Sequence, residues 1–265
     1  MILHSEGALL RIILQTDHAA FAAELCRRWG GSLFARPEPM ASLVTVTERH
    51  DEGWLPWQAA PRVDPATGRP WSFTNIPNIY HTSGHAAGVE RVKQADAYAG
   101  LLLSLHVAGL YKQRYGWMSH MPIPPIPAEY RPAAEAFLTE QERVQAELIA
   151  LLQPAEASLW AHYRYLQAWD TLSLLICTGW IGEEPGLLGS FPTHPGGPDL
   201  ALKCWALGGD RYTVSPWPFD VDQFTWAIPA RWLPDQPWAS DAAFQAALDS
   251  APWGSLPVHM VRSQA

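Results

Sequence analysis

The chain has 265 residues, of which 48% are hydrophobic, and it carries a formal net charge of −8 with an isoelectric point near 5.6. This length and apolar content suffice for one large domain, and the acidic balance argues against nucleic acid or an anionic membrane as a partner, because both require a basic face. The three cysteines show no CxxC spacing, so we expect neither a disulfide framework nor a cysteine zinc site, and a reducing, cytoplasmic location. Charged residues interrupt the N-terminal apolar stretch, so the sequence predicts neither a signal peptide nor a membrane span.

The first part of the chain is typical of a hairpin followed by helices. Residues 1–15 alternate loosely between apolar and polar, which predicts a strand or hairpin. Residues 16–31 begin with Thr16 or Asp17 as a capping residue and end on glycine, which indicates a helix. Residues 40–52 have apolar side chains at helical spacing and predict a second helix.

The rest of the chain changes from helical to strand-rich character. Residues 81–115 show a helical pattern with a break near Asp96, and residues 130–153 form the clearest amphipathic helix. A further helix is predicted at 157–178. Beyond residue 185, turn residues and alternating apolar positions predict strands, including a hairpin around Gly208–Gly209, and one short helix.

These elements predict an α+β fold. Five to seven helices at residues 16–178 form the core, and an antiparallel sheet combines both ends of the chain. We interpret residues 1–265 as a single domain, in which a strand-rich extension at 185–265 packs with residues 1–15.

Histidines and aspartates recur in the helical part of the chain. Each lies on a different predicted helix or at a helix end, so that each helix can direct a metal ligand inward. Adjacent residues on a helix point about 100° apart; a contiguous His-Asp pair therefore suits two neighbouring ions, or one ion reached by a bent helix end. In order, the candidates are His18, the pair His50-Asp51, His81 or His85, His106 and Asp170. The other histidines are interpreted as core or surface residues: His4, His120, His162, His194 and His259.

This ordered pattern resembles the HD superfamily of metal-dependent phosphohydrolases, whose signature is a histidine, then a contiguous His-Asp, then a distant aspartate. The matching residues are His18, His50-Asp51, His106 and Asp170, and the segment WDTLSLL at 169–175 is similar to the last motif of the superfamily. The likeness covers about residues 16–178. The chain as a whole also resembles an uncharacterised bacterial family that carries these segments.

The HD resemblance implies two metal ions with a shared ligand. One ion would be held by His18, His50, Asp51 and Asp170, and the second by Asp51, His81 and His106. We prefer His81 to His85 because His81 opens its helix, whereas His85, one turn later on the same face, would line the pocket. Nitrogen and oxygen ligands without thiolate suit two divalent or mixed-valence ions, with iron favoured and Mn, Zn or Co as alternatives.

The same resemblance implies a hydrolytic chemistry. Two ions that share the Asp51 carboxylate can activate a water molecule and clamp a phosphoryl group, so Asp51 and His85 are also catalytic candidates. Lys112 and Arg114 follow the His106 helix and are candidates for gripping a phosphate, with Arg91, Lys93 and Arg164 as further basic residues. We expect the segments 53–80 and 116–129 to cover the pocket, because long segments of this kind are often functional. The expected rim is aromatic: Trp54, Trp57, Trp71, Tyr80 and Trp117.

Three functions stay open at this point. The first is a metal-dependent hydrolase of a phosphoester or related small molecule. The second is a di-iron HD-type oxygenase that cleaves a small organic substrate with O₂, because Glu52-Gly53-Trp54 stands where many phosphohydrolases of the superfamily carry a lysine and because the rim is aromatic. The third is a non-catalytic binding protein. We expect a small-molecule ligand, and the apolar, tryptophan-rich C-terminal strands are compatible with a homodimer.

Overall fold

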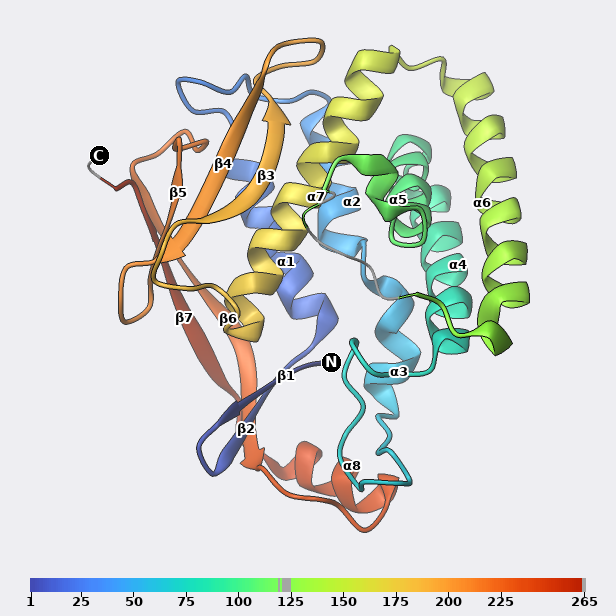
Figure 1. The fold of residues 1–265 in the computed structure, drawn as a ribbon, viewed down its shortest axis with the longest axis vertical. Helices are drawn as coiled ribbons and strands as arrows, with labels where there is room; N and C mark the ends of the chain where they lie inside the picture. Colours follow the sequence, from blue (N-terminus) through green and yellow to red (C-terminus); the bar gives the residue numbers. More distant parts are fainter. Residues whose placement is uncertain (119, 121–124, 264–265) are drawn as a thin grey trace.

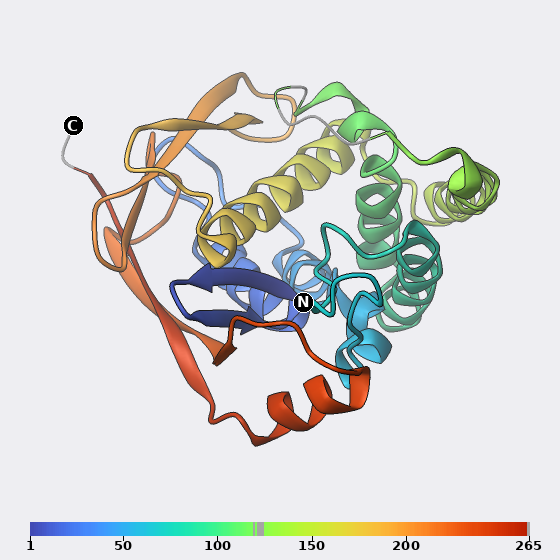
Figure 2. The same ribbon diagram turned by 60° about the horizontal axis from the view of Figure 1, so that its bottom comes forward.

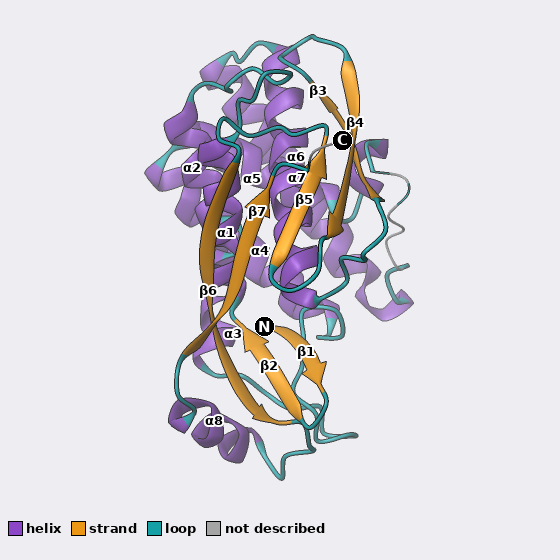
Figure 3. Ribbon diagram, turned by 90° about the vertical axis from the view of Figure 1, so that its left-hand side faces the viewer, coloured by secondary structure: helices purple, strands orange, loops and turns teal. Residues whose placement is uncertain are grey.

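The structure is a computed structural model that describes residues 1–118, 120 and 125–263. A group of helices lies beside a strongly curved sheet (Figure 1), and the helices stack behind one face of that sheet (Figure 3). Buried and exposed residues alternate along β6 and β7, as expected for strands with one covered face. The predicted α+β fold is confirmed.

The helices occupy the predicted regions. α1 packs against α2 and α7, while α5 packs against α4, α6 and α7, and both α5 and α7 are buried on nearly all sides. The α-helices are α1 (Gln15–Arg28), α2 (Met40–Arg49), α3 (Leu55–Ala59), α4 (Asn78–Ala95), α5 (Ala97–Gly109), α6 (Arg131–Leu152), α7 (Glu156–Thr178) and α8 (Asp241–Ser250). The short 3₁₀ helices are η1 (Glu52–Trp54), η2 (Gln113–Gly116) and η3 (Ala128–Tyr130).

The sheet joins the two ends of the chain, as predicted. Its order is β1-β2-β6-β7-β5-β4-β3, so the N-terminal hairpin adds to the C-terminal strands through the β2–β6 pair; Figure 2 shows this dark blue hairpin between α7 and the C-terminal segment. Every neighbouring pair is antiparallel except β5 and β7, which run parallel, so the sheet is mixed and not purely antiparallel. The strands are β1 (Ile2–Glu6), β2 (Leu9–Ile13), β3 (Gly186–Pro192), β4 (Asp199–Ala206), β5 (Arg211–Ser215), β6 (Gln223–Pro234) and β7 (Gly254–Val261).

The N-terminus of α1 is capped from elsewhere in the chain. The helix begins at Gln15, and its N-cap residue Leu14 makes no side-chain cap. The prediction that Thr16 or Asp17 caps this helix is wrong. Instead Gln58, on α3, accepts the backbone N–H groups of Gln15 and Thr16 with its Oε1 atom at 2.6 and 3.3 Å. This long-range cap satisfies donors that the first helical turn leaves unpaired.

The two segments expected to cover a pocket differ in structure. Residues 53–80 are not one long loop, because they contain most of η1, all of α3 and the start of α4. The segment 116–129 lies partly outside the described residues, at 119 and 121–124. The predicted break near Asp96 is confirmed: its carboxylate accepts the N–H of Ala99 at 2.9 Å and begins α5.

One large hydrophobic cluster connects the helices to the sheet. It includes Phe21 of α1, Trp169 of α7 and Ile228 of β6, all of them buried. A smaller cluster, with Met1 and Phe244 among its members, lies where the N-terminal hairpin meets α8. Within the described part of the chain, no helix combines the length and apolar character that crossing a bilayer requires.

Three glycines bring the segment after the His-Asp pair against α4. A Cβ atom added to Gly53 would lie 2.4 Å from the carbonyl oxygen of Gly84, and one added to Gly84 would lie 2.9 Å from that of Gly53. A Cβ on Gly88 would lie 3.1 Å from the Gly53 nitrogen. The backbones of η1 and α4 therefore touch, and this contact sets how near α4 lies to His50 and Asp51.

Replacing Gly53 by Ala tests this contact. The added methyl group overlaps backbone atoms that cannot rotate away, so we expect the free energy of unfolding to fall by about 1–3 kcal/mol, measured by urea denaturation. Gly182→Ala is the matched control, because nothing lies closer than 3.9 Å to its added Cβ. Equal stability of the two variants would contradict the close approach.

A buried histidine outside the predicted site is expected to make the fold sensitive to acid. His162 on α7 is 1% exposed, and a hydrogen bond of 2.8 Å joins its Nδ1 atom to the hydroxyl of Tyr98. Burial lowers the pKa of His162 from 6.5 to about 4. The folded protein therefore holds this ring neutral at pH values where the unfolded chain would protonate it.

We expect His162 to weaken the fold as the pH falls. Between its unfolded pKa of 6.5 and its folded pKa of about 4, the unfolded state binds the extra proton, so stability drops with decreasing pH, by at most about 2 kcal/mol at pH 5. His162→Asn is expected to show a smaller loss of unfolding free energy between pH 7 and pH 5. His194→Asn, at an exposed loop position, serves as control, and an unchanged pH dependence in His162→Asn would refute the assignment.

Candidate metal centre

Five of the predicted ligands meet in the interior of the helical layer. His18 comes from α1, His50 and Asp51 from the end of α2, His106 from α5 and Asp170 from α7. Their exposed fractions run from 0% at His18 to 8% at Asp51. Buried charged and imidazole groups are costly unless they are paired or bind a metal, so this gathering requires a chemical explanation.

The adjacent His-Asp pair faces one place because the helix ends between its members. His50 keeps helical torsion angles (φ −61°, ψ −24°), whereas Asp51 leaves them (φ −105°, ψ 14°). On a continuing helix the two side chains would diverge by about 100°. The geometry agrees with the interpretation of a bent helix end that brings both side chains to one centre.

The distances among the ligand atoms suit a shared ion. His18 Nε2 lies 2.8 Å from Asp51 Oδ2 and 3.9 Å from Asp170 Oδ1, and His50 Nε2 lies 3.4 Å from Asp170 Oδ1 and 3.7 Å from Asp51 Oδ2. Ligand atoms about 2.0–2.2 Å from one zinc ion lie about 3 to 3.5 Å from each other. Two overlapping groups have all their ligand atoms within 4.8 Å of one another: His18, His50 and Asp51, and His50, His106 and Asp170.

Hydrogen bonds fix which nitrogen of His18 and His50 faces the centre. The hydroxyl of Ser173 donates to the carbonyl of Asp170 at 2.8 Å, so its oxygen accepts from His18 Nδ1, also at 2.8 Å. His50 Nδ1 donates to the carbonyl of Thr47 at 2.7 Å. Both rings thus carry a proton on Nδ1 and turn Nε2 toward the carboxylates, the arrangement typical of metal-bound histidines.

The arrangement places a ring nitrogen against a carboxylate. His18 Nε2 lies 2.8 Å from Asp51 Oδ2, a contact that a proton or a metal ion between the two atoms makes favourable. His50 Nε2 is buried without a hydrogen-bond partner among the described residues. An unpaired buried nitrogen beside two carboxylates is what a cation would satisfy, so the residues fit a metal ion.

The two carboxylates dominate the electrostatics of the centre. Burial alone would lower the pKa of His50, but the charges of Asp51 and Asp170 outweigh it and raise that pKa to about 9. Burial likewise opposes ionisation of both acids, yet the neighbouring histidines, His50 foremost, hold the pKa of Asp51 and of Asp170 below the ordinary value. Without a metal, a proton on His50 therefore offsets part of the negative charge of the two carboxylates.

His81 and His85 lie beside the centre on α4. The rings of the two residues are 5.9 Å apart, and the His81 ring meets Trp54 edge-on at 5.0 Å. Burial lowers their pKa values to about 3 and about 4, against the opposing charge of Asp51, so both rings are neutral and able to bind a metal. Neither belongs to the ligand groups found within the described residues, and the second-ion role of His81 stays a prediction.

The predicted phosphate-binding residues differ in whether hydrogen bonds connect them to the centre. Lys112 pairs with Glu142 on α6, and no ion pair or hydrogen bond found among the described residues joins it to the centre. Arg114 lies closer: its Nε donates to Gln167 Oε1 at 3.2 Å, and Gln167 Nε2 lies 2.7 Å from His106 Nδ1. Arg164 instead binds Asp199 and the carbonyl of Ser190, away from the cluster.

Sequence reasoning missed the residues that orient the ligands. Gln167 and Ser173 lie three positions before and after Asp170 on α7, so all three share one helix face. That spacing was a usable signal, since a polar Gln and Ser flanking a ligand on a buried helix are natural partners for its neighbours. Thr47 acts through its backbone carbonyl, which no side-chain pattern reveals.

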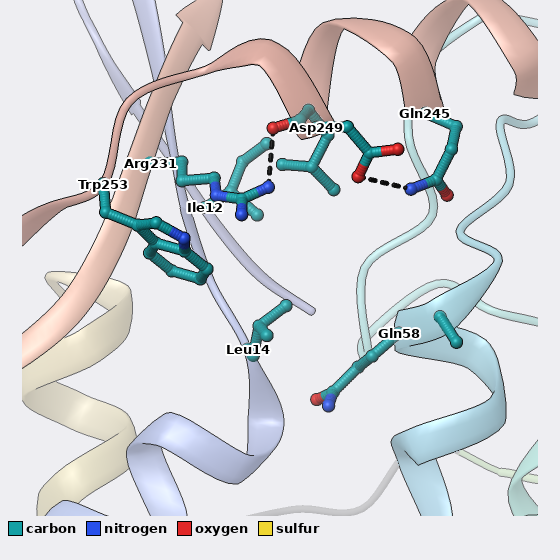
Figure 4. Close-up of a pocket in the computed structure, with 9 residues that line it drawn as sticks. Ile12, Leu14, Gln58, Arg231, Gln245, Asp249 and Trp253 are labelled. Atoms are coloured by element: carbon teal, nitrogen blue, oxygen red, sulfur yellow. Dashed lines mark hydrogen bonds between the residues drawn. The ribbon is translucent and has the colours of Figure 1, made fainter.

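A separate surface pocket of about 200 Å³ lies between α8, α3 and the end of β2. Figure 4 shows Arg231 and Trp253 on one side of it and Gln58 on the other. The guanidinium of Arg231 lies over the Trp253 ring at 3.8 Å and donates to the carbonyl of Leu248. The lining contains none of the predicted site residues.

Fold and site together define an α+β protein with a buried histidine and aspartate cluster that fits a metal ion. Residues 1–235 match DUF3891, a family described as protein of unknown function, and the chain belongs to that family. This agrees with the expected resemblance to an uncharacterised family. No curated protein and no solved structure matches the chain.

Removing one ligand tests the centre. We expect His50→Ala and Asp170→Asn each to weaken metal binding by roughly tenfold or more, since loss even of outer partners costs 10–100-fold. Elemental mass spectrometry of purified protein measures the metal content. His194→Ala, at an exposed loop position, is the matched control; full metal content in both ligand variants would place the ion elsewhere.

Proposed function

We propose that this protein is a metal-dependent hydrolase of a small phosphoester or a related oxygen-rich substrate, with the HD type of metal centre. The observation that carries the proposal is the meeting of His18, His50, Asp51 and Asp170 from two helices and the end of a third, with distances that suit one ion. The order of these residues along the chain, which resembles the HD signature, supports it.

The four residues would hold the ion through two imidazole nitrogens and two carboxylates. This donor set, free of thiolate, suits Fe, Mn, Zn or Co. When bound, such an ion supplies Lewis-acid activation of water and of a substrate oxygen.

The chain's own residues prepare the site for this chemistry. Ser173 and Thr47 orient the rings of His18 and His50, so little rearrangement is needed on metal binding. Burial of Asp51 and Asp170 strengthens their interaction with any cation, because the local dielectric constant is low. Trp54, 7% exposed, packs edge-on against His81 of α4, beside the centre.

The proposal is tested by metal loading followed by turnover. Protein freed of metal and then loaded with Mn²⁺, Zn²⁺, Co²⁺ or Fe²⁺ is expected to hydrolyse a generic phosphomonoester, and Asp51→Asn to lower kcat/KM by roughly 100-fold or more. His194→Ala should retain full activity.

Other outcomes would replace the proposal. Protein purified with iron, a visible absorption band and substrate-dependent O₂ consumption would establish the oxygenase. Protein that binds no metal and turns over no ester would be a binding protein. Hydrolysis that persists unchanged in Asp51→Asn would place the active site away from the cluster.

A further inference from the structure

We propose that His106 is a hydrogen-bond donor to the substrate and not a metal ligand, because Arg114 and Gln167 fix its ring in the neutral tautomer with the proton on Nε2. Distance alone would count it as a ligand, since its Nε2 belongs with His50 and Asp170 to a group whose ligand atoms lie within 4.8 Å. The direction of its hydrogen bonds argues otherwise.

The argument begins at Arg114, which can only donate hydrogen bonds. Its Nε lies 3.2 Å from one terminal atom of the Gln167 amide, so that atom must be the carbonyl oxygen. The other terminal atom is then the NH₂ group, which lies 2.7 Å from His106 Nδ1. An NH₂ group donates, so His106 Nδ1 accepts and carries no proton, and the proton of the neutral ring is on Nε2.

A ring in this state has no lone pair to offer a metal at Nε2. If an ion bound there, Nδ1 would have to carry the proton, and Gln167 would have to turn its oxygen toward His106. Its NH₂ group would then face the Arg114 guanidinium, donor against donor. Gln167 is fully buried and cannot relieve this clash with water.

The turn that carries Arg114 is held in an uncommon conformation. Gln113, Arg114 and Tyr115 have φ values of 50°, 48° and 53°, a left-handed run that side chains other than glycine rarely adopt. Tyr115 anchors it, packing against Trp160 at 5.3 Å and Tyr163 at 5.5 Å. Such strain persists where surrounding contacts demand it, and here it presents Arg114 to Gln167.

His106 and His50 therefore present different groups at Nε2. Thr47 accepts from His50 Nδ1 and leaves Nε2 as a ligand, whereas Gln167 donates to His106 Nδ1 and leaves Nε2–H as a donor. The Nε2 atom lies 3.8 Å from Asp170 Oδ2, beyond hydrogen-bond distance, so its proton is available to an oxygen atom of a ligand. Under the proposed function, on which this role rests, that oxygen belongs to an anionic or carbonyl group of the substrate. A neutral histidine in this position stabilises developing negative charge without giving up its proton.

The tautomer is measurable without turnover. In long-range ¹H–¹⁵N spectra of the metal-free wild-type protein, with His106→Ala used to assign the signal, the His106 ring is expected to show a protonated Nε2 and an unprotonated Nδ1. Metal-free protein titrated with Zn²⁺ is expected to bind about one ion per chain, and His106→Ala to bind the same amount. A ring with its proton on Nδ1, or loss of Zn²⁺ from His106→Ala, would overturn the proposal.

Gln167→Glu should reverse the state of His106. A carboxylate accepts from Nδ1–H and still pairs with Arg114, so Nε2 becomes a ligand, as in carboxylate–histidine–metal triads. We expect the ¹⁵N signals to switch and the Kd for Zn²⁺ to fall below the wild-type value. Gln94→Glu, at an exposed position on α4, is the control for added charge and should change neither the ¹⁵N signals of His106 nor the binding of Zn²⁺. Unchanged ¹⁵N signals of His106 in folded Gln167→Glu would contradict the proposal.

Arg114→Ala provides a second test if Gln167→Glu fails to fold. Without Arg114 the amide can turn, so His106 should populate both tautomers, and a ring that remains wholly protonated on Nε2 would refute the part assigned to Arg114. These readouts stand apart from the proposed function. Absence of ester hydrolysis would count against the proposed hydrolase. It would not affect the conclusion about the His106 tautomer, which is measured in the metal-free protein.

Discussion

The structure depends on a ring nitrogen and a carboxylate oxygen held 2.8 Å apart in a place without bulk water, His18 Nε2 and Asp51 Oδ2. Neither can move away freely, because Ser173 holds the far side of the His18 ring and Asp51 stands where α2 has just ended. A nitrogen lone pair facing a carboxylate is unfavourable until a cation lies between them. The fold therefore attracts positive charge to this place, either as a proton shared by His18 and Asp51 or as a metal ion.

Three residues of α7 contribute to the cluster, one as a carboxylate and two as hydrogen-bond partners of its histidines. Asp170 supplies a carboxylate, Ser173 one turn later sets the tautomer of His18, and Gln167 one turn earlier sets that of His106. Residues three apart lie on the same face of a helix, so a single buried helix controls the proton positions on two rings contributed by α1 and α5. Moving α7 would disturb the ligand and both orienting groups together, and its burial on nearly all sides restrains such movement.

The ordered histidines and aspartates were readable from the sequence because each stands on a recognisable helix or helix end, and helical periodicity is a local property. The α+β class was predictable for the same reason. The Gln58 cap on α1, the parallel β5–β7 pair and the Lys112–Glu142 pair are contacts between residues distant in sequence, and no local pattern encodes them. The opposite hydrogen-bond roles of His50 and His106 were equally hidden, since they depend on which partner faces Nδ1.

Strands of the C-terminal part of the chain help to position the candidate metal centre in the helices. Strand β2 ends at Ile13 and α1 begins at Gln15, so His18 lies one turn beyond a strand that β6 holds in the sheet. The match to DUF3891 ends at residue 235, next to the end of β6 at Pro234. The matched segment therefore contains every residue of the centre and also the strand that fixes the start of α1, whereas α8 and β7 lie beyond it. Positioning His18 to within hydrogen-bond distance of Asp51 requires a rigid start to α1, and the β2–β6 pair with the Gln58 cap provides it.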